Sequence, residues 1–266
     1  MGEYRHYGRR PGIQVLLLDR TFSNTYNPFH SMKRTLIITF AIILYSTPIY
    51  AADIESTCYG TTANGRLENG VALPKKGTNF RSYTALGGIL GRTYVHSRVR
   101  DVIVNSFRAL EISRPETVYV YGETGKRYGG SFKPHRTHQN GLSVDFMVPV
   151  LDSKDRSIPL PANIFNKYGY GIEFDAKGQH GSCRIDFEAM ASHLLALKQE
   201  TDRAGIGMWR VIFDPQLQPY LFKTKSGSLL KQNNISFSKK RSWVRHDEHY
   251  HVDFIVACES METDVK

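Results

Sequence analysis

Two stretches of the chain carry apolar residues at helical spacing. The first runs from Ser97, an expected N-cap, to about Glu111. The second is capped by Asp186 and runs to about Ala204, with Gly205 as the expected stop. The apolar positions are Val99, Val102, Ile103, Phe107 and Leu110 in the first stretch and Phe187, Met190, Ala191, Leu194 and Leu197 in the second. The spacing therefore predicts two amphipathic helices, each with one buried face.

Four shorter stretches have the pattern of β-strands. Residues 117–121 and 209–213 are rich in β-branched and aromatic residues, and a last strand is expected over residues 250–257. Residues 142–150 alternate strictly, which places Asp145 on the face opposite the apolar side chains. Because helices and strands mix without a regular βαβ order, the pattern predicts an α+β domain with a largely antiparallel central sheet flanked by helices.

Two segments show no clear periodicity. Residues 53–96 are rich in Gly, Thr, Asn and Tyr, and residues 151–185 contain Pro, Gly and Lys. Such compositions are typical of turns and loops. We therefore expect irregular structure in both segments.

The chain begins with features of an export signal. Met32-Lys33-Arg34 precedes an apolar run of about 11 residues, and Ala51-Ala52 supplies a small-residue cleavage site. The run is shorter than the roughly 20 residues that span a membrane, so we predict a signal peptide at residues 32–51 rather than a membrane anchor. Residues 1–31 are interpreted as an upstream extension, with translation starting at Met32. The mature domain is then expected to be residues 52–266, which is long enough for one core, and we expect it to be exported.

The charge of the mature domain is moderate. The chain has 35 basic and 25 acidic residues, of which residues 1–51 hold six and two. The remaining formal charge of about +6 suits an anionic polymer surface or simple solubility. No block of Lys and Arg is interleaved with aromatic residues, so a nucleic-acid partner is disfavoured.

All three cysteines lie in the predicted mature domain. An exported protein can oxidise such residues. A bridge between Cys58 and Cys258 would tie the two ends of the domain together. One cysteine is left over in any pairing, with Cys183 the third candidate, so the sequence leaves the pairing open.

Five of the ten histidines lie in two clusters about a hundred residues apart. Residues 134–145 contain two histidines and Asp145, and residues 246–253 contain three histidines. His249 and His251 are two apart on a predicted strand and project from the same face. An isolated H-x-H is more often an exposed strand edge, but three histidines within six residues are rare by chance. Two imidazoles and a carboxylate match a catalytic zinc set with an open fourth position, so we predict one Zn²⁺ per chain.

Other hydrolytic and nucleotide-binding motifs are absent from the sequence. There is no H-E-x-x-H and no G-x-S-x-G, which disfavours a thermolysin-like protease and a serine hydrolase. Residues 122–127 lack the spacing and the Ser or Thr of a P-loop. The histidine clusters therefore remain the main candidates for chemistry.

The two clusters resemble a known family. The pattern H-x-x-H-Q-x-G-L-x-V-D, followed by H-x-x-H-x-H, is similar to that of the penicillin-insensitive murein endopeptidases, in the lysostaphin, D-Ala-D-Ala metallopeptidase and hedgehog superfamily. The resemblance spans about residues 81–256 and departs at Ser143, where the family usually has a second acidic residue. It implies a hedgehog/DD-peptidase-like fold. It also implies His138, Asp145 and His251 as zinc ligands, His249 as catalytic base, and His246 and His135 as supporting polar groups.

The resemblance implies a zinc metallopeptidase that cleaves peptidoglycan cross-links between D-alanine and diaminopimelate. Two alternatives stay open from the residues alone. One is a D-alanyl-D-alanine carboxypeptidase or dipeptidase, and the other is a zinc-bearing peptidoglycan-binding module without turnover. Asp247, Glu248 and Asp253 are expected to be solvated or to orient a ligand histidine. No role is expected for Tyr250, and His96, His180 and His193 are expected to be surface or core histidines.

Overall fold

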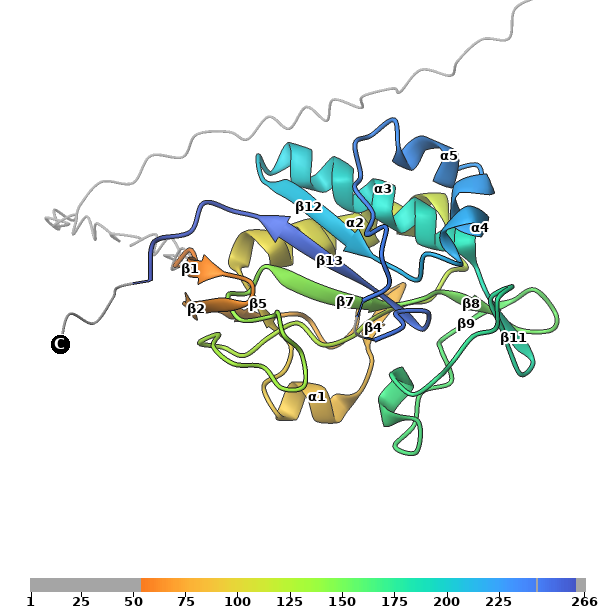
Figure 1. Ribbon diagram of the computed structural model, residues 1–266, viewed down its shortest axis with the longest axis horizontal. Coiled ribbons are helices and arrows are strands. Elements are labelled where there is room, and N and C mark those ends of the chain that lie inside the picture. The colour runs from red at the N-terminus through yellow and green to blue at the C-terminus, as the bar shows by residue number, and fades with distance from the viewer. Residues whose placement is uncertain (1–53, 243, 262–266) are drawn as a thin grey trace, which may run out of the picture. The chain divides into compact units, whose positions relative to one another are not determined.

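The computed structural model describes residues 54–242 and 244–261, and its centre is a five-stranded sheet (Figure 1). The predicted signal peptide and the extension before it lie outside the described residues. The sheet order is β12 (Gly207–Ile212), β13 (His249–Ile255), β7 (Ser143–Met147), β6 (Tyr119–Tyr121) and β4 (Phe80–Ser82). All neighbouring strands are antiparallel except β4 and β6. The predicted α+β domain with a largely antiparallel sheet is therefore confirmed.

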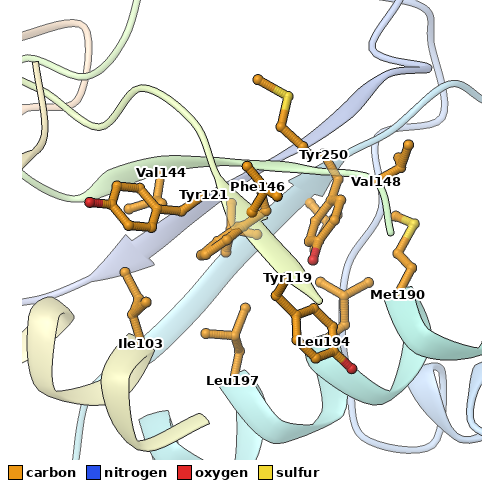
Figure 2. Packing of buried hydrophobic residues seen from close by; sticks show 14 of the residues in the cluster. Ile103, Tyr119, Tyr121, Val144, Phe146, Val148, Met190, Leu194, Leu197 and Tyr250 are labelled. Carbon is orange, nitrogen blue, oxygen red and sulfur yellow. The ribbon is translucent and has the colours of Figure 1, made fainter. Parts of the chain in front are cut away.

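Two long helices cover one face of this sheet. Their bounds are Ser97–Ser113 for α2 and Phe187–Arg203 for α3, close to the predicted ranges. In Figure 2, Ile103 of α2 and Leu194 of α3 reach the strand residues Val144 and Phe146. Two short helices, α4 (Gln218–Lys223) and α5 (Gly227–Leu230), pack against α3. The hydrophobic core therefore lies between these helices and one face of the sheet.

The helix ends follow local capping chemistry. Asp186 caps α3 as predicted, since its side chain accepts a hydrogen bond from the Ala189 N–H at 2.9 Å. Gly205 follows α3 with φ of +61°, which favours glycine. The expected cap Ser97 is wrong: His96 is the N-cap of α2, and its Nδ1 accepts from the Arg98 N–H. A ring nitrogen one bond further from the backbone than a hydroxyl fills the same role here.

The alternation of β7 is confirmed, but both of its faces are buried. Val144 and Phe146 pack on the helices, while Asp145 points to the opposite face. On that opposite face Asp145 is enclosed by histidine side chains and by Tyr170, and α1 (Ala85–Ile89) lies further out. Asp145 is therefore a fully buried carboxylate, which requires charged or hydrogen-bonding partners.

The two segments expected to be irregular contain short strands, so that expectation is wrong. The first holds β1 (Thr57–Thr61), β2 (Asn64–Glu68), β3 (Val71–Ala72), β4, α1 and β5 (Tyr94–Val95). The second holds β9 (Ser157–Ile158), the 3₁₀ turn η1 (Lys167–Gly169), β10 (Gln179–His180) and β11 (Cys183–Ile185), which with β8 (Val150–Leu151) form a second sheet. Strands of two to five residues are too short to show a period, because tertiary pairing rather than local pattern defines them.

The cysteine pairing left open by the sequence is Cys58 with Cys258. The bridge joins β1 to the segment that follows β13, two positions 200 residues apart. Cys183 is a free, buried thiol. The ends of the domain are thus tied together, as an oxidising compartment permits.

His193, for which the sequence left a surface or a core position open, is a core histidine. Its ring lies 4.9 Å from that of Phe107, and its Nδ1 is hydrogen-bonded to the Tyr250 hydroxyl. Complete burial lowers the pKa of His193 to about 3, so the imidazole is neutral in the folded protein.

This burial predicts a pH-dependent loss of stability. Between pH 6.5 and 3 the unfolded chain binds a proton at His193 that the folded chain does not. The free energy of unfolding therefore decreases by about 1.4 kcal/mol for each unit by which the pH is lowered. Urea unfolding at pH 7 and pH 5 should show a loss about 2 kcal/mol larger in the wild type than in His193→Gln. Other titrating groups are common to both proteins and cancel. Equal losses would mean that His193 titrates normally in the fold.

Candidate metal centre and catalytic cleft

The pairing of β7 with β13 places the first elements of the site. In the register of the two strands, Asp145 lies opposite His251, and Met147 lies opposite His249. The Nδ1 of His251 is 2.9 Å from Asp145 Oδ1, and the Nε2 of His249 is 3.8 Å from Asp145 Oδ2. The two histidines therefore face the same side of the sheet as the carboxylate, as their spacing predicted.

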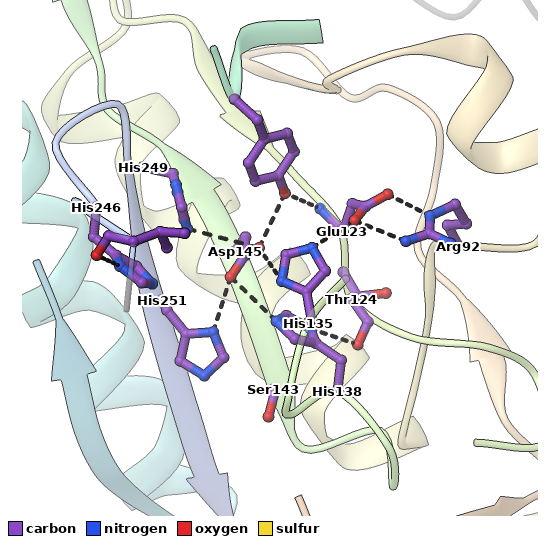
Figure 3. Close-up of polar contacts among 12 residues, drawn as sticks. Arg92, Glu123, Thr124, His135, His138, Ser143, Asp145, His246, His249 and His251 are labelled. Atoms are coloured by element: carbon purple, nitrogen blue, oxygen red, sulfur yellow. Dashed lines mark hydrogen bonds and ion pairs between the residues drawn. The ribbon is translucent and has the colours of Figure 1, made fainter. Parts of the chain in front are cut away.

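The loop before β7 brings His138 to the same carboxylate. His138 is fully buried, with φ of +67°, and Gly141 turns the chain into the strand with φ of +77°. The Nδ1 of His138 donates to the Thr124 carbonyl at 3.0 Å. This bond leaves Nε2 as the free nitrogen, 3.3 Å from Asp145 Oδ1 (Figure 3).

His135 approaches Asp145 from the same loop. Its Nε2 donates to Glu123 at 2.6 Å, and its Nδ1 lies 3.8 Å from Asp145 Oδ2. Glu123 also accepts hydrogen bonds from two guanidinium nitrogens of Arg92. Burial opposes the charge of Glu123, but His135 and Arg92 outweigh it and lower its pKa to about 2. His135 is thus held by a carboxylate that is ionised at neutral pH.

The arrangement fits a metal ion. Within the described residues, His138 Nε2 is buried and has no hydrogen-bond partner, an arrangement that costs free energy unless another group binds there. Its 3.3 Å separation from Asp145 Oδ1 is close to the roughly 3.4 Å between donors of a tetrahedral zinc site. The ligand atoms of His135, His138 and Asp145 all lie within 4.8 Å of one another. His251 Nδ1 lies 2.9 Å from the Asp145 oxygen that His138 Nε2 also approaches, so His251 is a further potential donor.

Asp253 fixes the orientation of His251. Its Oδ1 is 2.8 Å from His251 Nε2 and accepts from Ser143 Oγ at 2.6 Å, and its Oδ2 is 2.6 Å from Arg210. Burial disfavours charge on His251, but Asp253 and Asp145 overcome it and raise its pKa to about 10. A metal cation bound at Nδ1 of His251 would interact favourably with the same two carboxylates that stabilise the protonated imidazole. Asp253 is therefore the orienting carboxylate that the sequence allowed for, and Ser143 supports it.

Glu248 plays the corresponding part for His249. Its Oε1 accepts from His249 Nδ1 at 2.7 Å, which turns Nε2 toward the cleft. Burial lowers the pKa of His249, but Glu248 and Asp145 outweigh burial and raise it. The ring of His246 lies 4.6 Å from that of His249, and burial together with His249 lowers the pKa of His246 to about 4. His246 is consequently neutral at pH 7.

The structure brings all six predicted site residues together and adds three that the sequence did not indicate. Glu123 and Thr124 hold the two loop histidines. The hydroxyl of Tyr170 donates to Asp145 Oδ2 at 3.0 Å and accepts from the Glu123 N–H. Burial, followed by the charges of Asp145 and Glu123, raises the pKa of Tyr170 well above 10. These residues lie in loops without a motif, so no sequence signal marked them.

A cavity of about 810 Å³ opens over these histidines. One wall is aromatic and apolar, with Tyr83, Leu86, Leu90, Tyr168 and Tyr170. Its lining holds five cations, Arg92, Lys133, Arg136, Lys167 and Arg210, and the carboxylates of Glu123 and Glu248. A cleft of this size and charge suits a peptide that carries carboxylates.

A comparison with protein families agrees with this geometry. The family model described as penicillin-insensitive murein endopeptidase matches residues 58–265. A search of curated proteins finds no match. None of the helices in the described part of the chain has the length and apolar character needed to cross a membrane.

The contact between Asp253 and His251 predicts a specific loss of metal affinity. Asp253→Asn removes the charge that orients His251, and loss of such an outer partner typically weakens metal binding 10–100-fold. Competition with a chelator of known zinc affinity measures the change. Asp202→Asn, at an exposed position of α3, is the control and should bind zinc as the wild type does. Equal affinities in both variants would contradict the role of Asp253.

Proposed function

The chain belongs to the penicillin-insensitive murein endopeptidase family, and we propose that it is an exported zinc peptidase acting on peptidoglycan cross-links. The bond proposed is the amide between D-alanine and diaminopimelate. The observation that carries the proposal is the arrangement around Asp145. One carboxylate oxygen faces His138 and His251, the proposed ligands, and the other faces the proposed base His249 and the supporting group His135.

The proposed zinc ligands are His138 Nε2, Asp145 Oδ1 and His251 Nδ1. Both histidine nitrogens lie within 3.3 Å of the same carboxylate oxygen, whereas His135 and His249 lie 3.8 Å from the other oxygen. Each ligand imidazole has its second nitrogen bonded to an acceptor, which fixes the ring. Two neutral imidazoles and one carboxylate would leave the zinc centre at a net charge of +1. Bound zinc supplies Lewis acidity for the scissile carbonyl and for the attacking water.

His249 is the proposed general base. Its Nε2 faces the cleft, and Glu248 on Nδ1 holds the ring and stabilises the imidazolium that forms. His249 takes the proton of the attacking water and later gives it to the leaving amine, so the proton balance closes over one turnover. A base positioned in this way typically contributes 10²–10⁴-fold to the rate.

His246 and His135 are the proposed supporting groups. His246 is neutral and stacks beside His249, and His135 is fixed by Glu123 on the other side of Asp145. Both line the cleft, where they can hydrogen-bond the base or the developing oxyanion. Loss of one oxyanion donor typically costs about 3 kcal/mol, or roughly a hundredfold in rate. A binding module without turnover would have no use for the Glu248–His249 pair.

Export to the periplasm is part of the proposal. The Cys58–Cys258 disulfide supports an oxidising compartment. The family acts on murein, which lies outside the cytoplasmic membrane. The predicted signal peptide at residues 32–51 would supply the route.

Digestion of purified peptidoglycan sacculi by residues 52–266 tests the proposed reaction. Conversion of cross-linked dimers to monomers, abolished by a chelator and restored by Zn²⁺, is expected. Chromatographic separation of the muropeptides gives the readout. Shortened stems with intact dimers would identify a carboxypeptidase instead, and unchanged sacculi despite one bound zinc would favour the binding module.

Replacement of the base separates metal binding from catalysis. His249→Ala should keep close to one zinc per chain and lose roughly 10²–10⁴-fold in turnover. His138→Ala, the matched variant, should lose zinc as well as activity. Metal content from atomic absorption and dimer cleavage from chromatography give the two readouts. Parallel loss of zinc and activity in His249→Ala would overturn the assignment of the base.

A further inference from the structure

A second groove lies beside the catalytic cleft. Its volume is about 440 Å³, and it lies between the turn of the β1–β2 hairpin and the paired strands β12 and β13. Thr137 and Arg210 line both the groove and the cleft. The groove and the cleft are therefore neighbours, with Thr137 and Arg210 at their common boundary.

A β-bulge turns Trp209 toward this groove. Met208 pairs with Phe254 and Arg210 with Asp253, so Trp209 is an extra residue in β12 without a partner in β13. Neighbouring residues of a regular strand point to opposite faces, but here Trp209 and Arg210 line the same groove. The Arg210 guanidinium lies 4.2 Å from the Trp209 ring centroid. Bulges beside active sites commonly re-aim a side chain in this way.

The groove is linked to the metal centre through Arg210. The Arg210 guanidinium pairs with Asp253, and Asp253 orients His251. The Trp209 side chain nevertheless remains 51% exposed. A large ring that is held in place and left open to water is typical of a binding surface rather than of a core.

The lining of the groove favours a neutral polar ligand. Its hydrogen-bonding side chains are the hydroxyls of Thr61, Thr62 and Thr137 and the amide of Asn140. Its one charged group, Arg210, is already paired with Asp253. The lining of the catalytic cleft, by contrast, holds five lysine or arginine side chains and two glutamates. The anionic peptide therefore matches the cleft, and an uncharged part of the substrate matches the groove.

We propose that this groove binds a sugar of the murein glycan strand, with one face of the pyranose ring packed on Trp209. A sugar ring combines an apolar C–H face, which suits an aromatic platform, with hydroxyl and acetamido groups, which suit threonine and asparagine. The glycan would then be held while the attached peptide enters the cleft. This inference rests on the proposed function, because it names the second part of the same substrate.

Kinetics on two substrates test the inference. Cross-linked dimers that carry their disaccharides are compared with the same peptides after an amidase has removed the sugars. Trp209→Ala should lower the preference for the sugar-bearing dimer about tenfold, mainly through KM, and Trp209→Phe should retain most of it. Ile112→Ala, which removes an 88% exposed apolar side chain from α2, is the control and should change neither substrate. An unchanged preference in Trp209→Ala would overturn the proposal.

A binding measurement separates this inference from the proposed reaction. A β-1,4-linked N-acetylglucosamine oligomer is titrated by calorimetry into the wild type, Trp209→Ala and the control Ile112→Ala. Saturable binding is expected in the wild type and in Ile112→Ala, and binding about tenfold weaker in Trp209→Ala. No binding in any protein, or equal binding in Trp209→Ala, would overturn the sugar site. Sugar binding by a wild type that leaves sacculi intact would overturn the peptidase alone.

Discussion

The register between β7 and β13 is the constraint on which the site depends. It sets Asp145 directly opposite His251 at the centre of the sheet, and it sets Ser143 opposite Asp253. If β7 slipped by one residue against β13, Asp145 would point into the core that the helices cover and away from His251. The apolar alternation of β7 prevents that slip, because Val144 and Phe146 would then leave the core. Packing on one sheet face thus holds the chemistry on the other.

Burial of charge is the second constraint on the site. Asp145, Glu123, Glu248 and Asp253 are all buried carboxylates, and each lies within hydrogen-bond or ion-pair distance of a histidine. Desolvation alone would raise the pKa of each acid, but the histidine partners more than offset it. Because a buried carboxylate without a partner is unfavourable, each of these acids holds its histidine partner in one orientation. A preorganised site follows, in which every proposed ligand and base has its second nitrogen occupied.

The two hollows around the site, the catalytic cleft and the groove beside it, differ in charge; they are called here the charged arm and the neutral arm. The catalytic cleft holds the cations, while the groove beside it holds Trp209 and neutral polar side chains. Arg210 belongs to both arms and contacts Asp253. The disulfide after β13 ties the hairpin that forms one wall of the groove to the end of that strand. The same strand pair that organises the metal centre therefore also shapes its extension.

The sequence by itself determined the features that depend on local periodicity and on motif spacing. The two long helices, the Asp186 cap, the face of Asp145 and the proximity of the two histidine clusters could all be predicted, since each depends on residues a few positions apart or on a specific pattern. The tertiary structure alone decided the short strands before residue 96, the His96 cap, the disulfide pairing, the contacts of Glu123 and Tyr170, and the bulge at Trp209. These features depend on partners brought together from distant parts of the chain, and a local pattern carries no record of which partner a buried polar group will meet.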